Sequence, residues 1–163
     1  MITTSNSSPP LQVSQWLNSP TPVTLNGLRG SVVVLHTFQM LCPGCVSHAL
    51  PQALEIAQTF ARDDVAVIGL HSVFEHHAAM TPTSLEAFLH EYRIGFPVGV
   101  DVAVAGSPIP ATMQAYRMQG TPTTILIDGA GRCGSRLRRR RVSVAGLTRS
   151  RPPAILARWN CLP

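Results

Sequence analysis

The sequence contains no lysine, and its eight acidic residues all lie before Gly131. No apolar run approaches the roughly 18 residues that a membrane-spanning helix needs. Residues 1–20 have neither the basic start nor the apolar stretch of a secretory signal. We therefore expect a cytoplasmic protein without a membrane span. In such reducing surroundings a pair of cysteines is more often catalytic or metal-binding than structural.

The net charge of +5 does not describe the whole chain. Up to Gly131, four arginines stand against eight acidic residues, so this part carries a charge of −4, whereas the last 32 residues hold nine arginines and no acid. A hydrophobic content of 45% in 163 residues is typical of one folded domain rather than a disordered chain. The charge pattern therefore gives no reason to expect nucleic-acid binding by that domain.

Composition and pattern divide the chain into three parts. Residues 1–24, rich in Ser, Pro and Asn, are expected to be a surface lead-in that Trp16 and Leu17 anchor to the domain. Residues 25–131 form the predicted α/β domain. Residues 132–163 form an atypical, Arg-rich tail. We find no internal repeat and no linker between two domains.

Apolar periodicity predicts alternating strands and helices within residues 25–131. Two buried strands with a helix between them make a parallel βαβ unit, and Pro51 is expected to kink that helix. Thr83 or Ser84 is expected to cap the next helix. A final strand is expected to form a hairpin with a successor. The predicted strands are 31–38, 65–73, 96–101 and 121–128, and the predicted helices are 45–64, 83–92 and 109–120.

The tail contains few apolar residues that could form a last strand and helix to complete the sheet. It contains four consecutive arginines and a Pro-Pro pair, and only "VSV" at 142–144 and "AILARW" at 154–159 suggest a strand and a helix. An Arg-rich, acid-free segment is typical of an arm that binds nucleic acid or a membrane surface. The abrupt change at Arg132 is also what a shifted reading frame would produce, and we favour this second interpretation. We therefore leave the C-terminal strand and helix unassigned.

Two cysteines stand where the first predicted strand meets its helix, in the order Cys42-Pro43-Gly44-Cys45. The reactive form of cysteine is the thiolate, which the unpaired N–H groups and the dipole of a helix N-terminus stabilise. Pro43 suits the first helical position, because its missing N–H costs no hydrogen bond there. The pattern predicts that Cys42 is the nucleophile. Cys45, one turn later, is then placed to attack a mixed disulfide formed at Cys42.

This motif, followed far downstream by "GTPTTILID" at 120–128, resembles the thioredoxin superfamily. The helix and strand between Thr83 and Asp101 make it most similar to the TlpA/ResA-like and redoxin (AhpC/TSA-like) branches. The resemblance covers about residues 25–131. It implies a thioredoxin-like fold, in which helices flank a central mixed β-sheet and an extra helix and strand are inserted.

The resemblance also implies the positions of substrate contacts. In the superfamily, the bond between the residues equivalent to Thr121 and Pro122 is cis and lies against the active-site sulfurs. Thr121 and Pro122 are therefore expected to contact the backbone of the substrate. Pro43 and Gly44, between the cysteines, complete the expected substrate-binding set.

Several residues depart from the family pattern or leave their role open. Leu41 replaces the tryptophan that usually precedes the first cysteine, and His36 replaces a buried acid. His36 is either a proton acceptor for Cys45, with a pKa nearer neutrality, or a neutral histidine hydrogen-bonded in the core. His48 could face the site or solvent. His71 is expected to be a strand-end histidine with satisfied hydrogen bonds.

The same residues are compatible with other classes of function. A zinc site needs two more ligands at workable spacing, which the sequence does not offer, so we expect no metal. A peroxidase of the peroxiredoxin type is the main alternative, although Gln39 stands where that family's motif has threonine and no arginine is near in sequence. Two inert core thiols, or a thioredoxin-like binding module without activity, are the remaining classes.

We therefore predict a thiol-disulfide oxidoreductase, with peroxide reduction as the alternative. Cys42, Cys45 and His36 are its predicted catalytic residues. No cofactor is expected, because the cysteine pair itself carries the electrons. The expected partners are a disulfide-containing protein, a small thiol or a peroxide as substrate, and a dithiol protein as reductant. We expect a monomer that binds neither nucleic acid through its core domain nor a membrane.

Overall fold

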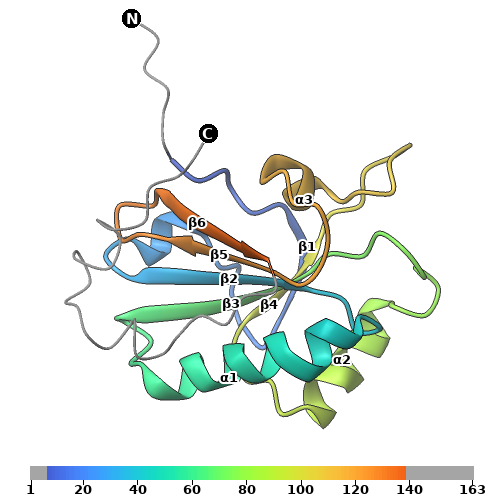
Figure 1. Ribbon diagram of the computed structural model, residues 1–163, viewed down its shortest axis with the longest axis horizontal. Helices are drawn as coiled ribbons and strands as arrows, with labels where there is room; N and C mark the ends of the chain where they lie inside the picture. Colours follow the sequence, from blue (N-terminus) through green and yellow to red (C-terminus); the bar gives the residue numbers. More distant parts are fainter. Residues whose placement is uncertain (1–6, 139–163) are drawn as a thin grey trace, which may run out of the picture.

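The computed structural model describes residues 7–138. The described residues form six strands in one mixed sheet, in the order β1-β4-β3-β2-β5-β6 (Figure 1). β2, β3 and β4 run parallel to one another. The pairs β1–β4, β2–β5 and β5–β6 are antiparallel. The strands are β1 (Val13–Leu17), β2 (Val32–Phe38), β3 (Val65–His71), β4 (Val98–Asp101), β5 (Thr123–Ile127) and β6 (Cys133–Arg138).

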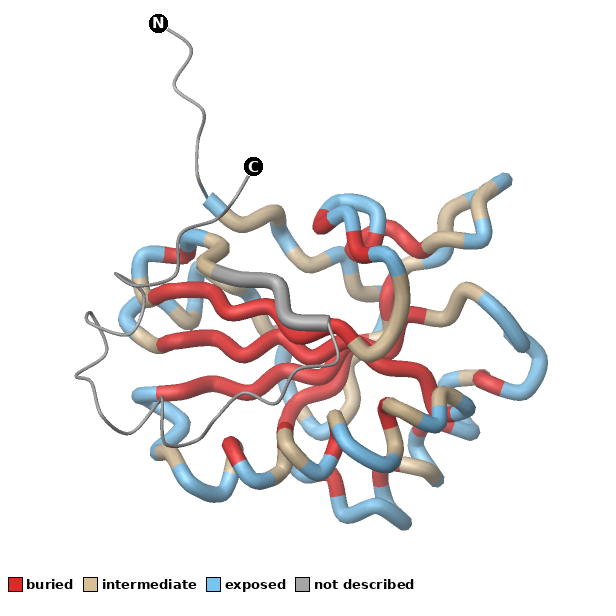
Figure 2. The backbone as a smooth tube through the Cα atoms, viewed as in Figure 1, coloured by how far each residue is buried: buried red, intermediate tan, exposed pale blue. Residues whose placement is uncertain are grey.

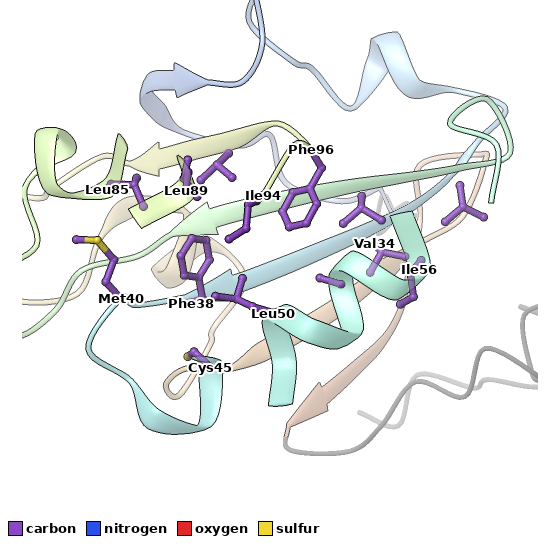
Figure 3. Packing of buried hydrophobic residues seen from close by; sticks show 14 of the residues in the cluster. Val34, Phe38, Met40, Cys45, Leu50, Ile56, Leu85, Leu89, Ile94 and Phe96 are labelled. Carbon is purple, nitrogen blue, oxygen red and sulfur yellow. The ribbon is translucent and has the colours of Figure 1, made fainter. Parts of the chain in front are cut away.

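The sheet has a hydrophobic core on each face. Every residue of β2 and β3 is buried, which their apolar, β-branched sequences predict for strands covered on both sides. Helices α1 (Leu50–Thr59) and α2 (Pro82–Glu91) cover one face, and their buried leucines pack against Phe38 (Figure 3). Helix α3 (Ala111–Ala115), with the N-terminal segment, covers the other. The red, buried strands lie between these two layers in Figure 2.

The lead-in contains a strand that the sequence analysis did not predict. β1 pairs with β4 at one edge of the sheet, and its residues are exposed or only half-buried. Ser14 and Gln15 break the apolar pattern by which buried strands are recognised. Trp16 and Leu17, the expected anchors, pack against different cores, as neighbours on a strand do.

The helix after Cys42 differs from a regular α-helix in its first turns. Pro43 and Gly44 are already helical, and a π-helical turn, η2 (Cys45–Ala49), precedes α1. Pro51 stands in the first turn of α1 and has no N–H for the carbonyl four residues earlier. The wider turn is a known way to accommodate such a gap. The sequence predicts a kink at Pro51, and the structure has a π-helical turn just before this residue.

The cap of α2 corrects a second prediction. Neither Thr83 nor Ser84 is the cap, because the helix begins at Pro82 and the Thr81 hydroxyl accepts the N–H of Ser84 at 3.2 Å. Because proline suits the first helical position, Pro82 sets the start of the helix, and the cap lies two residues before Thr83.

No helix within residues 7–138 combines the length and apolar character needed to cross a membrane.

The predicted hairpin partner of the last strand lies in the first residues of the tail. β6 pairs antiparallel with β5, so the sheet continues beyond Gly131. Gly131 itself adopts a positive φ of 72° in the connecting turn, a conformation that favours glycine. The candidate strand at 142–144 and the candidate helix at 154–159 lie outside the described residues.

A buried carboxylate anchors α3 to the sheet. Asp101 ends β4, and its oxygens accept the backbone N–H groups of Thr112 at 2.8 Å and Met113 at 3.1 Å. The Ser72 hydroxyl donates to the same carboxylate at 2.9 Å. Burial raises the pKa of Asp101, while these hydrogen bonds favour its charged form. The carboxylate therefore satisfies N–H groups that a five-residue helix would otherwise leave unpaired.

We expect Asp101→Ala to lower the free energy of unfolding by about 2–4 kcal/mol, because three buried donors lose their acceptor. Urea denaturation at neutral pH measures the loss. Asp63→Ala, which removes an exposed carboxylate, is the matched control. Equal stability of the two variants would show that the Asp101 hydrogen bonds contribute nothing net.

Candidate active site

The two cysteines lie at the carboxyl end of β2, where the chain turns into the helix. The N–H of Cys42 donates to the carbonyl of Gln39 at 3.2 Å, which closes the turn after the strand. Cys42 is half-buried and Cys45 is fully buried, and both thiols are free. Leu41, which precedes Cys42, is 57% exposed and forms apolar surface next to it. Only the first thiol is therefore open to a partner.

Cys42 occupies the cap of the helix, as its spacing predicts. Its carbonyl accepts the N–H groups of Cys45 at 3.0 Å and Val46 at 3.1 Å. Its sulfur accepts the N–H of Cys45 at 3.3 Å. This N–H belongs to the first turn of the helix and points at the sulfur atom. The backbone of the first turn is thus arranged for a nucleophile at Cys42.

Cys45 is in a different electrostatic position. Burial, together with the hydrogen bond and charge of the neighbouring Cys42, raises the pKa of Cys45 to about 12. Hydrogen bonds from the backbone of Gln39 and the side chain of Thr121 act in the opposite direction. Cys45 is therefore a protonated thiol in the reduced protein. It can act only after Cys42 has reacted and its proton has left.

The loop before β5 lies against the cysteine motif. The Thr121–Pro122 bond is cis, as the family resemblance implies. A Cβ placed on Gly44 would lie 3.6 Å from Pro122 Cδ, so the proline ring is within packing distance of the cysteine turn. The Thr121 side chain interacts with Cys45 and acts to lower the pKa of that thiol. The structure thus brings together Cys42, Gly44, Cys45, Thr121 and Pro122, and leaves Pro43 exposed beside them.

His36 does not have the pKa expected of a proton acceptor for Cys45. Burial lowers the pKa of His36 to about 4, so the expectation of a value nearer neutrality is wrong. Its Nδ1 is hydrogen-bonded to Thr124 Oγ1 at 3.0 Å, and its ring stacks near Phe38. The interactions that set the pKa of Cys45 do not include His36. These observations favour the neutral, hydrogen-bonded core histidine.

His48 and His71 lie in different surroundings. His48 is exposed, with Nδ1 at 2.6 Å from Ser47 Oγ. His71 is buried at the end of β3, and within the described residues neither of its ring nitrogens has a hydrogen-bond partner. The expectation of a satisfied histidine at this position is wrong. A strand-end position suggests nearby backbone partners, but the ring points into the apolar core beside Phe38.

Gln39 is a site residue that the sequence analysis did not identify as functional. It follows β2 and is almost completely buried, with 1% of its surface exposed. Its side chain reaches Thr121, Glu75 and the backbone of Phe74. The available signal was a glutamine directly after seven buried strand residues, where an unpaired amide would be costly.

The potential metal ligands among the described residues do not gather around one point. Within residues 7–138, no group of three or more His, Cys, Asp or Glu side chains is placed to hold an ion. The Cys45 thiol instead interacts with Cys42, with the backbone of Gln39 and with the side chain of Thr121. This arrangement suits exchange between sulfur atoms.

The comparison with known families agrees with this geometry. Residues 9–133 match the family model described as the AhpC/TSA family. The chain belongs to the AhpC/TSA family. The match confirms the redoxin resemblance inferred from the cysteine motif and the "GTPTTILID" segment. It also includes β1, which lies in the predicted lead-in.

Solved structures similar to this AhpC/TSA family member confirm the thioredoxin-like fold. A thioredoxin-like superfamily protein is 50% identical, with a TM-score of 0.84, and the match covers 96% of this chain and 99% of that one. A thiol-disulfide isomerase from Corynebacterium glutamicum is 44% identical, with a TM-score of 0.85, over 94% of this chain and 97% of that one.

A curated relative is much longer than this chain. NHL repeat-containing protein 2 of Gallus gallus is 34% identical over 87 residues. The match covers 52% of this chain and 12% of that protein.

Proposed function

We propose that this AhpC/TSA family member is a thiol-disulfide oxidoreductase. The observation that carries the proposal is the pairing of a half-buried Cys42 at a helix cap with a buried Cys45 one turn later, beside the Thr121–Pro122 loop. The thiol-disulfide isomerase of Corynebacterium glutamicum, at 44% identity, supports the same reaction class.

The reaction is an exchange of disulfides. The Cys42 thiolate attacks a substrate disulfide, forms a mixed disulfide and releases the first substrate thiolate. The Cys45 thiolate then attacks the Cys42 sulfur and releases the second substrate thiolate. The substrate is reduced, and the enzyme is left with a Cys42–Cys45 disulfide. An external dithiol protein or small thiol reduces this bond again, so no further cofactor takes part.

Peroxide reduction is the second candidate, because the family model carries the AhpC/TSA description. In that reaction Cys42 would become a sulfenic acid and Cys45 would condense with it. Gln39 stands where the peroxidase motif has threonine. Within residues 7–138, the side chain of Arg29 bonds Asn26 and that of Arg132 bonds Asp128, and neither partner belongs to the cysteine motif. We therefore place disulfide exchange first.

We expect a disulfide to oxidise Cys42 faster than hydrogen peroxide does, by about two orders of magnitude or more at equal concentration and neutral pH. The rates are measured by alkylation trapping in a Cys133→Ser/Cys161→Ser background. A faster reaction with peroxide would replace the proposed function with the peroxidase.

Four further points stay predictions from the sequence: the TlpA/ResA-like assignment, an antioxidant role, the monomeric state and the cytoplasmic location.

A further inference from the structure

The side chain of Gln39 connects three segments around the cysteine pair. Its Oε1 accepts the backbone N–H of Phe74 at 3.4 Å. Its Nε2 lies 3.3 Å from Thr121 Oγ1 and 3.5 Å from Glu75 Oε1. Phe74 and Glu75 belong to the loop after β3, and Thr121 belongs to the loop before β5. One amide therefore ties both loops to the end of β2.

These neighbours fix the orientation of the amide. A backbone N–H can only donate, so the atom of Gln39 that faces Phe74 must be the oxygen. A carboxylate can only accept, so the atom that faces Glu75 must be the nitrogen. Both neighbours give the same answer. Nε2 therefore donates to Thr121 Oγ1.

The orientation of Gln39 determines what the Thr121 hydroxyl can do. A hydroxyl group that accepts a hydrogen bond on its oxygen still has one proton to donate. The contact between the Thr121 side chain and Cys45 favours the Cys45 thiolate, which is the effect of a donor. Gln39 thus donates to Thr121 Oγ1 at 3.3 Å, which leaves the Thr121 proton available to Cys45.

We propose that Gln39 is a positioning residue for the resolving step: its amide holds the Thr121 hydroxyl as a donor toward Cys45 Sγ while a substrate is attached to Cys42. The inference rests on the proposed function and assigns a residue to its second half-reaction. In that step the bond between Cys42 and the substrate sulfur breaks and the Cys42–Cys45 bond forms. The Cys45 thiolate supplies the electron pair, its proton leaves to solvent, and the substrate leaves as a thiolate.

The pH dependence of the resolving step is set by the ionisation of Cys45 rather than by the titratable groups around it. Cys42 carries no charge while it is in a mixed disulfide. His36 on β2 and His71 on β3 both have a pKa lowered to about 4 by burial, so they stay neutral above pH 6. His48 on the same helix is exposed and bonded to Ser47. Glu75 contacts Gln39 Nε2 at 3.5 Å.

The test separates the two half-reactions with dithiobis(nitrobenzoate), an aromatic disulfide. Attack by Cys42 releases one coloured thiolate, and resolution by Cys45 releases a second. Both phases are followed by stopped-flow absorbance from pH 6 to 10, in the full chain with Cys133→Ser and Cys161→Ser. The leaving thiol stays ionised in this range, so the pH profile of the second phase reports the ionisation of Cys45.

Gln39→Glu is the decisive variant, because a carboxylate can only accept and would turn the Thr121 proton away from Cys45. We expect the second phase to slow about tenfold or more at neutral pH, so that it reaches a given rate only about one pH unit higher than in the unmodified protein. The first phase should change less than about twofold. Gln114→Glu makes the same chemical change on α3, where Gln114 bonds Ser107 and Ile109, and should leave both phases unchanged.

Thr121→Val keeps the inference testable if Gln39→Glu does not fold. It should shift the pH dependence of the second phase in the same direction, whereas Thr121→Ser, which restores the hydroxyl, should return it to that of the wild type. An unchanged second phase, or an equal slowing of both phases, would overturn the role of Gln39. A wild-type protein that releases neither thiolate would instead reject the proposed function.

Discussion

Cys42→Ser is expected to abolish disulfide exchange, whereas Cys45→Ser should accumulate a covalent mixed disulfide with its substrate. The half-buried Cys42 is the thiol that a partner can reach, and without its sulfur no intermediate forms. We expect turnover to fall by about three orders of magnitude or more. Cys45 is fully buried and protonated, so its loss should spare the attack and block the release.

Mass spectrometry of the two variants after incubation with a disulfide peptide distinguishes these outcomes. Cys45→Ser should gain the mass of one peptide chain and lose it on addition of dithiothreitol. Cys42→Ser should show no adduct. Cys133→Ser is a matched control, because Cys133 packs with the core on the opposite face of the sheet from Cys45. An adduct of equal yield on Cys42→Ser would reverse the two assigned roles.

Stability is expected to fall steeply as the pH drops from about 6.5 toward 4, because two buried histidines resist protonation. Burial lowers the pKa of His36 and of His71 to about 4, from 6.5 in an exposed histidine. Between these values the unfolded chain binds protons that the folded chain does not. The stability conferred by neutral imidazoles is thus present above pH 6.5 and is lost below it. Two such groups give a slope of roughly 2 to 3 kcal/mol per pH unit.

Urea denaturation at half-unit steps of pH measures this slope, and His71→Leu provides the discriminating variant. Within the described residues the ring nitrogens of His71 have no partner, so an apolar side chain of similar size loses no hydrogen bond there. We expect the slope to fall by about half and stability at pH 7 to be kept or raised. Asp101 acts in the opposite direction, since its raised pKa means that protonation favours the folded state.

His90→Gln controls for the loss of a histidine as such, because 86% of the His90 side chain is exposed. It should leave the slope unchanged. If His71→Leu kept the full wild-type slope, acid sensitivity would have to come from the carboxylates. If it kept stability but lost disulfide exchange, the unpaired imidazole would have a role in the reaction rather than in folding.

Local sequence patterns were sufficient for the centre of the fold. The apolar run that ends at Phe38 predicted β2, and the spacing of apolar residues after Cys45 predicted the helix that packs on it. Pro43 after Cys42 predicted where the helix begins. These features depend on residues a few positions apart, whose backbone preferences act before any distant contact forms. The hairpin of β5 and β6 was predicted as a pairing, although its second strand begins inside the atypical tail.

Distant contacts decided the rest. β1 is an edge strand with a weak pattern, and it becomes recognisable only through its pairing with β4. The low pKa of His36 and the unpaired nitrogens of His71 follow from what surrounds each ring in the core.

The sequence by itself determined the chemistry of this protein, because two thiols two residues apart at the start of a helix have their geometry set by one helical turn. Only the tertiary structure decided how that chemistry is controlled. Gln39 meets Thr121, 82 positions later in the chain, and Phe74, 35 positions later. Hydrogen bonds between such distant residues exist only once the sheet has brought the ends of β2, β3 and β5 together.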